Sequence, residues 1–532
     1  MQGGAATGAG AYAAAALAFR PAMKIHFTAA PLRIDALAPL LSGQRVELTL
    51  GPDVRRRIAA ARQVVDRALA SGATVYGINT GFGKLSRERI EGRDLERLQV
   101  NLLRSHACGM GAPLPPEIVR TMMVLRARTF ATGRSGVRVE LVEKLCELLA
   151  ADLIPQVPTQ GSVGASGDLA PLAHLALALI GEGGKCWLAG REMSVRAALK
   201  RAGIAPIALA AKEGISLING TQLTTAIAVQ ALLRAENLAR SADVACALTV
   251  EALKGTNRAF DRRIHEARPH PGQLAVARNL HGLIAGSAIL ESHRDCGRVQ
   301  DPYSLRCAPQ VHGACRDALV EARRVLEIEI NASTDNPLVF AEEGELISGG
   351  NFHAQPIAAT ADRIAAAVAD LQSISERRTE NLVNPDLSGL PAFLTPKPGL
   401  NSGFMIPQVV AAALVSESKA LSFPASVDSI PTSANKEDHV SMGPIAARKA
   451  LQIVENGERV LAIELLCAAQ GLDFEPEWKS SRPLEAARAA IRREVKTLAD
   501  DRYLAPDLAA LAELVRGGEL VAAARAAGGK LE

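Results

Sequence analysis

The stretch "TQLTTAIAVQALLRAENLARSADVACALTVEAL", residues 221–253, decides the fold class. It runs for 33 residues without glycine or proline, and its apolar residues recur every three or four positions. This spacing places the apolar side chains on one face of a helix and predicts a single long helix. Similar patterns follow at 312–331, 354–380, 403–421 and 444–470. The sequence therefore predicts a mainly α protein, built as an elongated bundle of long helices.

The N-terminal part of the chain is richer in loops. Short helical patterns alternate with loops from about residue 46 to 156, beginning with "DVRRRIAAARQVVDRALASG" at 53–72. Gly72 is the expected end of that first helix, because glycine readily adopts the left-handed conformation that closes a helix. Four segments are expected, with 25–532 folding as one cooperative unit: a disordered extension (1–24), an N-terminal part (25–215), a central bundle of long helices (216–480) and a C-terminal helical segment (481–532).

The composition excludes several classes of protein. Of the 532 residues 48% are hydrophobic but only 3% aromatic, so aliphatic side chains must fill the core. The net charge of +4 is small and no basic stripe is present, which excludes a nucleic-acid partner. Apolar runs such as 404–415 are shorter than the roughly 18 residues that a membrane span needs. The apolar N-terminal stretch lacks the preceding cations of a signal peptide. We expect a cytoplasmic protein with no membrane partner.

The eight cysteines are scattered and form no C-x-x-C pair, which is typical of buried thiols in a reducing compartment. A metal site is the alternative for Cys296, Cys307, Cys315 and His312, which are close in sequence. Their spacing matches no zinc template, so we expect no metal.

Several loops carry functional groups that contrast with this aliphatic background. The loop at 75–85 holds Tyr76, and the loop at 300–313 holds Gln300, Tyr303 and Arg306. Further candidates are Ser105, His106, Asn219, Phe352, His353, Glu437 and His439. Each has an ordinary structural explanation when taken alone, such as a turn asparagine or a solvated carboxylate. Together they indicate a pocket assembled from distant loops on a rigid helical scaffold.

The residue types in this pocket suit chemistry on an amino or hydroxy acid. Arginine binds a carboxylate through two parallel hydrogen bonds, and a phenol with a lowered pKa acts as a general base. Such a set of residues still lacks an electrophile.

The segment "GSVGASGDLAPLAH", residues 161–174, can supply that electrophile. Neither a phosphate-binding loop nor the G-x-S-x-G nucleophile turn matches this segment, because Gly167 is followed by Asp168 and Leu169. A helix cap at Asp168 accounts only for the residues C-terminal to it. If the Gly167 nitrogen attacks the Ala165 carbonyl carbon, a five-membered ring closes, and loss of two waters leaves a methylidene on Ser166. The neighbouring glycines permit the strained backbone. The predicted product is 4-methylidene-imidazol-5-one, formed autocatalytically from Ala165, Ser166 and Gly167, with no external cofactor.

Seven motifs, taken together and in order, carry a resemblance over about residues 30–530. The chain resembles the aromatic amino acid ammonia-lyases that carry a methylidene-imidazolone prosthetic group. The motifs are "YGINTGFG", "GSVGASGDLAPLAH", "LINGTQ", "QDPYSLRC.PQVHG", "STDNPLVF", "SGGNFHAQP" and "SANKEDHVSMG".

Two positions distinguish substrates within that family. Ser105 with His106 resembles the pair found in members that act on histidine, and Glu437 matches a carboxylate that those members also have. A carboxylate can bind an imidazole N–H but suits a bare phenyl ring poorly. Departures from the family pattern are slight: Lys436 stands where Gln is common, and Cys108 where a small residue is common. The resemblance thus implies elimination of ammonia from L-histidine to give trans-urocanate, the first step of histidine breakdown.

The resemblance also implies a role for each site residue. The ring takes the substrate amino group as a leaving group, Tyr76 removes the β-proton, and Arg306 with Asn219 holds the carboxylate. Gln300 and Tyr303 surround the prosthetic group, Phe352 packs against it, and His106 with Glu437 orients the imidazole. Tyr303 is the second candidate for the base. The family forms homotetramers with shared active sites.

Two other functions remain open from the sequence. The first is a related tyrosine or phenylalanine ammonia-lyase, or a 2,3-aminomutase, with the same prosthetic group. The second is a catalytically silent helical scaffold. Such a scaffold would be free to lose Ser166, Tyr76 or Arg306, and all three are present.

Overall fold

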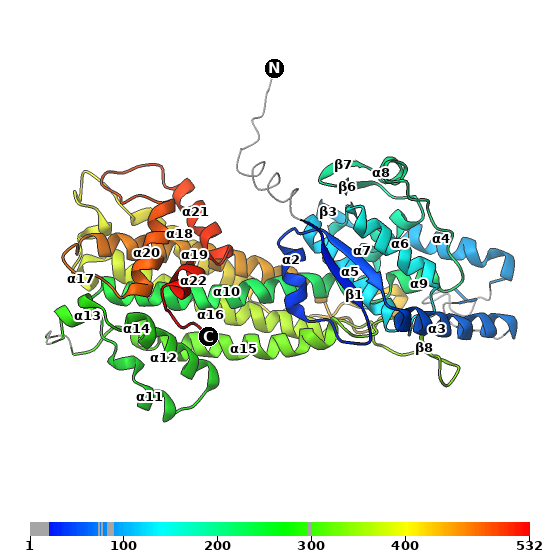
Figure 1. Cartoon of the computed structure of the whole chain (residues 1–532), viewed down its shortest axis with the longest axis horizontal. Helices are drawn as coiled ribbons and strands as arrows, with labels where there is room; N and C mark the ends of the chain where they lie inside the picture. Colours follow the sequence, from blue (N-terminus) through cyan, green and yellow to red (C-terminus); the bar gives the residue numbers. More distant parts are fainter. Residues whose placement is uncertain (1–20, 73–74, 76–77, 82–89, 295–296, 298) are drawn as a thin grey trace, which may run out of the picture. The chain divides into compact units, whose positions relative to one another are not determined.

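The computed structural model describes residues 21–72, 75, 78–81, 90–294, 297 and 299–532. It confirms the mainly α class, with a few short strands (Figure 1). The chain divides into two compact units. Unit 1 comprises Met1–Gln230, Arg324–Thr360 and Pro424–Arg448, and unit 2 comprises Ala231–Arg323, Ala361–Phe423 and Lys449–Glu532. The sequence-based division at residues 215 and 480 stays a prediction.

Unit 1 contains most of the strands together with short and medium helices. Its elements are β1 (Met23–Phe27), η1 (Ile34–Leu37), α2 (Ala38–Leu41), β2 (Val46–Leu50), α3 (Pro52–Ala70), η3 (Gly92–Asp94), α4 (Leu95–His106), β3 (Met110–Pro113), α5 (Pro116–Ala131), α6 (Val139–Ala150), β4 (Leu153–Pro155), β5 (Pro158–Gln160), α7 (Leu169–Leu179), β6 (Lys185–Leu188), β7 (Arg191–Ser194), α8 (Val195–Ala202), α9 (Glu213–Ile218), β8 (Leu338–Phe340), β9 (Glu345–Ile347) and η6 (Ser433–Asn435).

Unit 2 is mainly helical over its described residues. Its elements are η4 (Arg258–Phe260), α11 (Arg262–Glu266), α12 (Pro271–Ile284), α13 (Ala288–Ser292), α14 (Tyr303–Arg306), α17 (Pro385–Ser388), η5 (Ala392–Leu394), α18 (Met405–Leu421), α20 (Arg482–Glu494), α21 (Ala505–Arg516) and α22 (Glu519–Ala526). Four long helices have residues in both units: α10 (Gln222–Ala252), α15 (Ala308–Glu329), α16 (Gln355–Val383) and α19 (Gly443–Asp473).

The predicted long helices are confirmed to within a few residues, which is the usual uncertainty of a helix end. The expected helix at 221–253 is α10, and those at 312–331, 354–380, 403–421 and 444–470 are α15, α16, α18 and α19. The predicted stop at Gly72 is also confirmed, because α3 ends at Ala70 and Gly72 has φ +72°.

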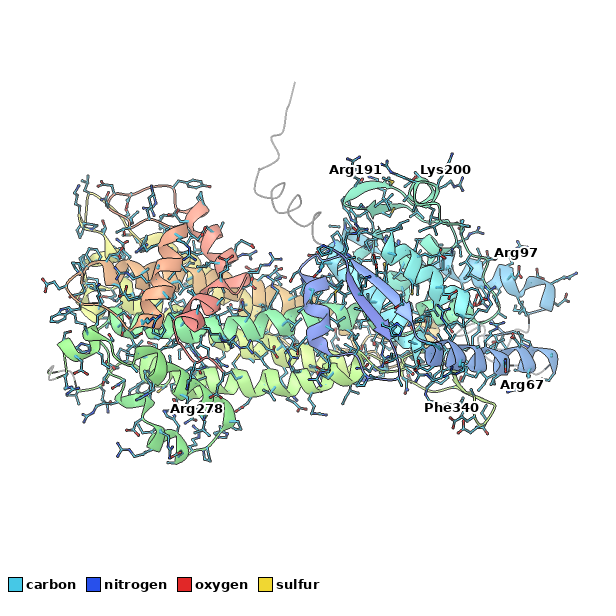
Figure 2. The ribbon with its side chains drawn as sticks, viewed as in Figure 1. Arg67, Arg97, Arg191, Lys200, Arg278 and Phe340 are labelled. Atoms are coloured by element: carbon cyan, nitrogen blue, oxygen red, sulfur yellow. The ribbon has the colours of Figure 1, made fainter. Side chains whose placement is uncertain are left out.

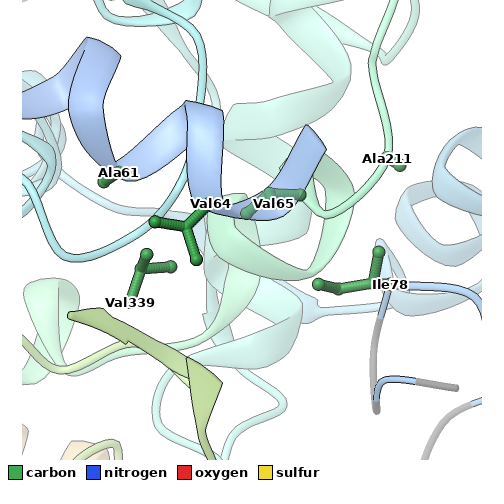
Figure 3. Close-up of a cluster of buried hydrophobic side chains, with 6 residues drawn as sticks. All are labelled: Ala61, Val64, Val65, Ile78, Ala211 and Val339. Carbon is green, nitrogen blue, oxygen red and sulfur yellow. The ribbon is translucent and has the colours of Figure 1, made fainter. Parts of the chain in front are cut away.

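Helix α3 shows how unit 1 forms its core. Its apolar residues recur at helical spacing, so that Val54, Ile58, Ala61 and Val65 are all buried on one face. In Figure 3 the end of this face meets Val339 of β8 and two buried loop residues. These loop residues are Ile78 and Ala211.

Four small sheets accompany the helices in the part of the chain that the structure describes. Strand β1 pairs in parallel with β2, with Met23 opposite Val46, while β3–β5, β4–β6–β7 and β8–β9 are antiparallel. Within the described ranges, no helix is long and apolar enough to cross a bilayer.

Helix α5 is a deeply buried helix that bears on the site. Every residue from Ile118 to Ala131 is buried, and the helix packs against α3 and α6. It nevertheless carries three buried arginines, Arg120, Arg126 and Arg128. This is unusual, because charged side chains normally lie at the surface. Figure 2 shows the ordinary arrangement at Arg67, Arg97, Arg191 and Lys200, whose side chains point outward.

Candidate active site

The ring-forming segment lies in the loop between β5 and α7, within unit 1. Ala165 and Gly167 are buried, and Ser166 is half-buried. Gly164 and Gly167 have φ of +70° and +77°, a region that favours glycine. A Cβ on Gly167 would lie 2.1 Å from the Gly220 carbonyl oxygen, and one on Gly164 would lie 2.3 Å from Ser441 Oγ. Glycine is therefore required at both positions by backbone conformation and by space.

This loop is held from three sides by backbone hydrogen bonds. Asp168 N–H donates to the Gly220 carbonyl (2.6 Å), Met442 N–H to the Val163 carbonyl (2.8 Å) and Ala354 N–H to the Gly164 carbonyl (3.3 Å). The Ser441 hydroxyl also donates to the Gly164 carbonyl (3.0 Å). A buried alanine, a serine and a glycine free of Cβ in a tightly held turn are what closure of an Ala-Ser-Gly ring needs. The residues present fit the predicted prosthetic group.

Asp168 occupies the predicted N-cap position of α7, but its side chain does not cap that helix. Its carboxylate accepts hydrogen bonds from the backbone N–H of Thr224 (2.9 Å) and from the Thr224 hydroxyl (2.7 Å). Burial raises the pKa of Asp168 to about 6, and the Thr224 hydrogen bonds oppose that rise. The carboxylate therefore ties the ring-forming loop to the first turn of α10. The helix-cap interpretation was right about the position and wrong about the contact.

Glu437 contacts the serine of the ring-forming segment directly. Ser166 Oγ donates to Glu437 Oε1 (2.9 Å), and Glu437 Oε2 accepts from Thr432 Oγ1 (2.6 Å) and Ser433 Oγ (2.8 Å). The carboxylate is thus fixed at both oxygens. Sequence reasoning placed Glu437 at the substrate imidazole and missed its contact with Ser166, which lies 271 positions away.

A left-handed turn delivers Glu437 to this position. Ser433, Ala434 and Asn435 have φ of 51°, 53° and 66°, which costs roughly 1–2 kcal/mol for each residue with a side chain. The turn is closed by paired backbone hydrogen bonds between Thr432 and Glu437 (3.0 and 3.4 Å). Backbone strain of this kind is found where a functional side chain must be aimed.

His106 is the last residue of α4, and Ser105 is an exposed neighbour. His106 Nδ1 lies 2.8 Å from the Leu102 carbonyl oxygen. Because a carbonyl only accepts, Nδ1 carries the proton and Nε2 of the neutral ring is left as an acceptor. Burial lowers the pKa of His106, while the Leu102 carbonyl and the Glu437 charge oppose that effect. A neutral His106 within the field of Glu437 suits recognition of a substrate N–H.

Asn219 and Phe352 also lie in segments that contact the loop. Asn219 follows α9, is 3% exposed, and donates from Nδ2 to the Asn336 carbonyl (3.1 Å). Phe352 is half-buried two residues before Ala354, whose N–H binds the Gly164 carbonyl. His353 Nε2 donates to the His439 carbonyl (3.1 Å), and the rings of these two histidines stack with centroids 5.9 Å apart.

The remaining predicted site residues belong to unit 2 or lie outside the described residues. Gln300, Tyr303 and Arg306 belong to unit 2, where Tyr303 is 71% exposed and the Arg306 guanidinium lies over its ring (4.4 Å to the centroid). Their membership of the site stays a prediction. Tyr76 lies outside the described residues.

The alternative metal site receives no support at His312. His312 Nδ1 lies 2.8 Å from Asp243 Oδ1, and Nε2 accepts from Arg378 (3.2 Å), so neither nitrogen is free for a metal. Cys296 lies outside the described residues. Elsewhere in the described chain, no group of three or more His, Cys, Asp or Glu side chains could hold a metal ion.

Sequence reasoning missed several residues that hold the loop. These are Arg126, Thr224, Ser441, Thr432 and Ser433. The hydroxyl residues give no distinctive signal in the sequence. Thr224 and Ser441 bind partners 56 and 277 positions away, and Thr432 and Ser433 bind Glu437 across the left-handed turn. Arg126 did give a signal: it interrupts the apolar run "MMVLRARTFA".

The chain is similar to known proteins over most of its length. The family model for aromatic amino acid lyases matches residues 32–493. A histidine ammonia-lyase from Deinococcus radiodurans is 56% identical over 486 residues, covering 91% of this chain and 92% of that protein. A histidine ammonia-lyase from Myxococcus xanthus is 52% identical over 493 residues, covering 92% and 97%.

Solved structures show the same similarity. The crystal structure of histidine ammonia-lyase from Trypanosoma cruzi superposes with a TM-score of 0.88 at 43% identity, covering 95% of this chain and 96% of that one. A tyrosine aminomutase from Streptomyces globisporus superposes with a TM-score of 0.90 at 35% identity, covering 96% and 100%.

Proposed function

Since this chain belongs to the aromatic amino acid lyase family and is a carbon–nitrogen lyase, we propose that it eliminates ammonia from L-histidine to give trans-urocanate. The observation that carries the proposal is the hydrogen bond from Ser166 to Glu437. It joins the predicted electrophile to one of the residues that distinguish a histidine substrate, and the Glu437 charge also acts on the other, His106, whose pKa burial lowers. The identity above 50% to histidine ammonia-lyases over most of the chain supports it.

The prosthetic group would be held by Ala165, Ser166 and Gly167, and it supplies an electrophilic carbon that makes the substrate amino group a leaving group. The protein's own residues position the substrate. Glu437 Oε1 accepts a hydrogen bond from Ser166 Oγ. The Ser166 oxygen would leave as water when the ring forms. The carboxylate oxygen then becomes available to an imidazole N–H of the substrate, while Thr432 and Ser433 continue to hold Oε2.

His106 and Asn219 complete the part of the pocket that unit 1 provides. His106 Nε2 can accept a second hydrogen bond from the substrate, and the Asn219 amide, together with Arg306, holds its carboxylate. Tyr76 takes the β-proton, and Gln300, Tyr303 and Phe352 line the surroundings of the ring. The β-proton is weakly acidic, so removing it needs both a positioned base and an activated leaving group.

A panel of substrates tests the proposal. The purified protein is mixed separately with L-histidine, L-tyrosine and L-phenylalanine, and ultraviolet absorbance is followed together with the products. We expect urocanate from histidine and no appreciable cinnamate or coumarate. A dominant cinnamate or coumarate signal would refute the histidine assignment, and a β-amino acid product would instead identify an aminomutase.

Replacing Glu437 by glutamine should lower kcat/KM for histidine roughly 10- to 100-fold. Glutamine keeps the size of the side chain but removes the charge, and a hydrogen bond to a charged group is worth roughly 1.5–3 kcal/mol. Steady-state kinetics of Glu437→Gln would measure this. Asp438→Asn is the matched control, because Asp438 is the exposed neighbouring carboxylate and should tolerate the change. Equal losses in the two variants would argue against a specific role for Glu437.

We also propose that the protein forms a homotetramer with shared active sites and acts in the cytoplasm. Helix α18 exposes a run of apolar side chains in unit 2: Met405, Ile406, Val409 and Val410. Ile406 is 60% exposed and Val409 52%, and a contiguous apolar face of this kind is usually covered by a partner. Light scattering tests this assembly, and a monomer would contradict it.

A further inference from the structure

Arg126 is a fully buried cation next to the ring-forming loop. Its guanidinium donates from Nη1 to the carbonyls of Ser216 (2.6 Å) and Asn219 (2.6 Å). From Nη2 it donates to the Asn219 carbonyl again and to Gln222 Oε1 (2.7 Å). The guanidinium thus spans the turn that joins α9 to α10.

No carboxylate within hydrogen-bond distance neutralises this charge among the described residues. The nearby carboxylates that act on its pKa, Asp335 and Asp168, form hydrogen bonds elsewhere: Asp335 with Lys212 (3.3 Å) and Asp168 with Thr224. Arg126 Nε is buried without a partner. Burial accordingly lowers the pKa of Arg126 to about 10. A buried cation whose partners are carbonyl oxygens and the face of the Phe130 ring (5.1 Å to the centroid), with no carboxylate, is costly, which argues that it serves more than packing.

The turn that Arg126 holds is the surface on which the ring-forming segment rests. Gly167 and Gly220 form an isolated parallel bridge, and Asp168 N–H donates to the Gly220 carbonyl (2.6 Å). A Cβ on Gly167 would lie 2.1 Å from the Gly220 oxygen, and a Cβ on Gly220 would lie 2.5 Å from Arg126 Nη2. Neither glycine therefore has space for a Cβ, and the guanidinium fixes the Asn219 carbonyl next to the Gly220 backbone on which the ring-forming segment rests.

We propose that Arg126 is a positioning residue for ring closure, acting through the Asn219–Gly220 backbone. In that closure a bond forms between Gly167 N and the Ala165 carbonyl carbon. The Ala165 oxygen leaves as water with the N–H protons of Ser166 and Gly167, and the Ser166 hydroxyl leaves as a second water with the Cα proton. No oxidant is needed. Attack by an amide nitrogen requires the two atoms to be held in contact, and a rigid Gly220 supplies that constraint. The inference rests on the proposed function, because it concerns the same prosthetic group.

The test replaces Arg126 by lysine and compares it with Arg128→Lys. Arg128 is a second buried arginine on the same helix, and it also donates to backbone carbonyls, those of Thr28 and Ala30, as well as to Asn331 Oδ1. Because these hydrogen bonds lead away from the turn at 216–222, Arg128 controls for loss of a buried guanidinium. Lysine keeps the charge in both variants but cannot span two carbonyls and an amide.

The readouts are the intact mass of the folded fraction, circular dichroism, and kcat and KM separately. We expect Arg126→Lys to fold, but most of its molecules should keep the full mass of the encoded chain, because the two waters of ring closure are not lost. The value of kcat should fall in proportion to the fraction of molecules without the ring, and KM should be unchanged. Arg128→Lys should lose both waters completely. If the role of Arg126 were purely structural, the variant would have a lower melting temperature, but every folded molecule would still have lost the two waters of ring closure.

Arg126→Met keeps the test valid if the lysine variant does not fold, since methionine leaves no buried charge. If either folded variant had lost both waters of ring closure in every molecule and had an unchanged kcat, the inference would be overturned. If the wild-type protein itself had the full mass of the encoded chain, with neither water lost, the proposed function would fail. That result is distinct from failure of the Arg126 role alone.

Discussion

Replacing Ser166 by alanine should abolish the methylidene group and lower kcat for histidine by at least ~10³-fold, on the scale of losing a covalent catalytic group. In the proposed ring closure Ser166 supplies the methylidene carbon and the oxygen that leaves as water, and alanine has no hydroxyl to lose. The variant should fold, because alanine is smaller than serine and Ser166 is only half-buried. Activity assays with circular dichroism measure both expectations.

Ser162→Ala is the matched control in the same loop. Ser162 Oγ donates to the Gly167 carbonyl (3.2 Å) and accepts from Gly164 N–H (3.2 Å), but it supplies no ring atom. We expect this variant to lose both waters, as we also expect of the wild-type protein. Substantial histidine turnover by Ser166→Ala would eliminate the electrophile assignment, whatever Ser162→Ala does.

Replacing Tyr76 by phenylalanine should lower kcat by roughly 10²- to 10⁴-fold, the usual contribution of a general base. Phenylalanine keeps the aromatic ring and removes only the phenol oxygen, so the fold should survive. The described neighbours of Tyr76 are well held: Val75 N–H donates to Asn79 Oδ1 (2.8 Å), and Ile78 is fully buried. Kinetics at saturating histidine would measure the loss.

Two further tyrosine variants make this experiment discriminating. Tyr503 is 81% exposed in unit 2 and has no assigned role, so Tyr503→Phe should retain full activity. Tyr303→Phe should cost less than Tyr76→Phe if Tyr303 only shapes the surroundings of the ring. The reverse order of losses would transfer the role of base to Tyr303.

The long helices could be predicted from the sequence because their signal is local. The spacing of apolar residues in 221–253 and the glycine at 72 act on neighbouring residues, and both predictions hold to within a few positions. The two compact units could not be read in this way. Each is assembled from three separate segments, and the division falls inside α10, α15, α16 and α19, where the helical pattern continues without a break.

The candidate site shows the same difference between local signals, which the sequence reveals, and distant contacts, which it does not. The ring closure at residues 165–167 stays a prediction, and it could be made because the failure of the phosphate and nucleophile-turn patterns is visible in a few adjacent residues. The contact between Ser166 and Glu437 could not be predicted, because it joins residues 271 positions apart and depends on a left-handed turn of Ser, Ala and Asn. Nothing local predicts that three non-glycine residues will adopt positive φ.

Asp168 shows why a correct position does not guarantee a correct contact. An aspartate just before a helix normally caps it, but Thr224 offers two donors at 2.9 and 2.7 Å. In a buried site, two donors to one carboxylate outweigh a single cap. That competition depends on tertiary structure, so sequence alone does not reveal it.

The central claim is that Ala165, Ser166 and Gly167 form the electrophile, and the mass of the intact protein tests it most directly. High-resolution mass spectrometry of the purified wild-type chain, together with peptide mapping, should show a mass lower by two waters than the encoded sequence. The loss should be confined to the peptide that contains residues 165–167. A mass equal to that of the encoded chain, or a water loss located elsewhere, would contradict the electrophile assignment.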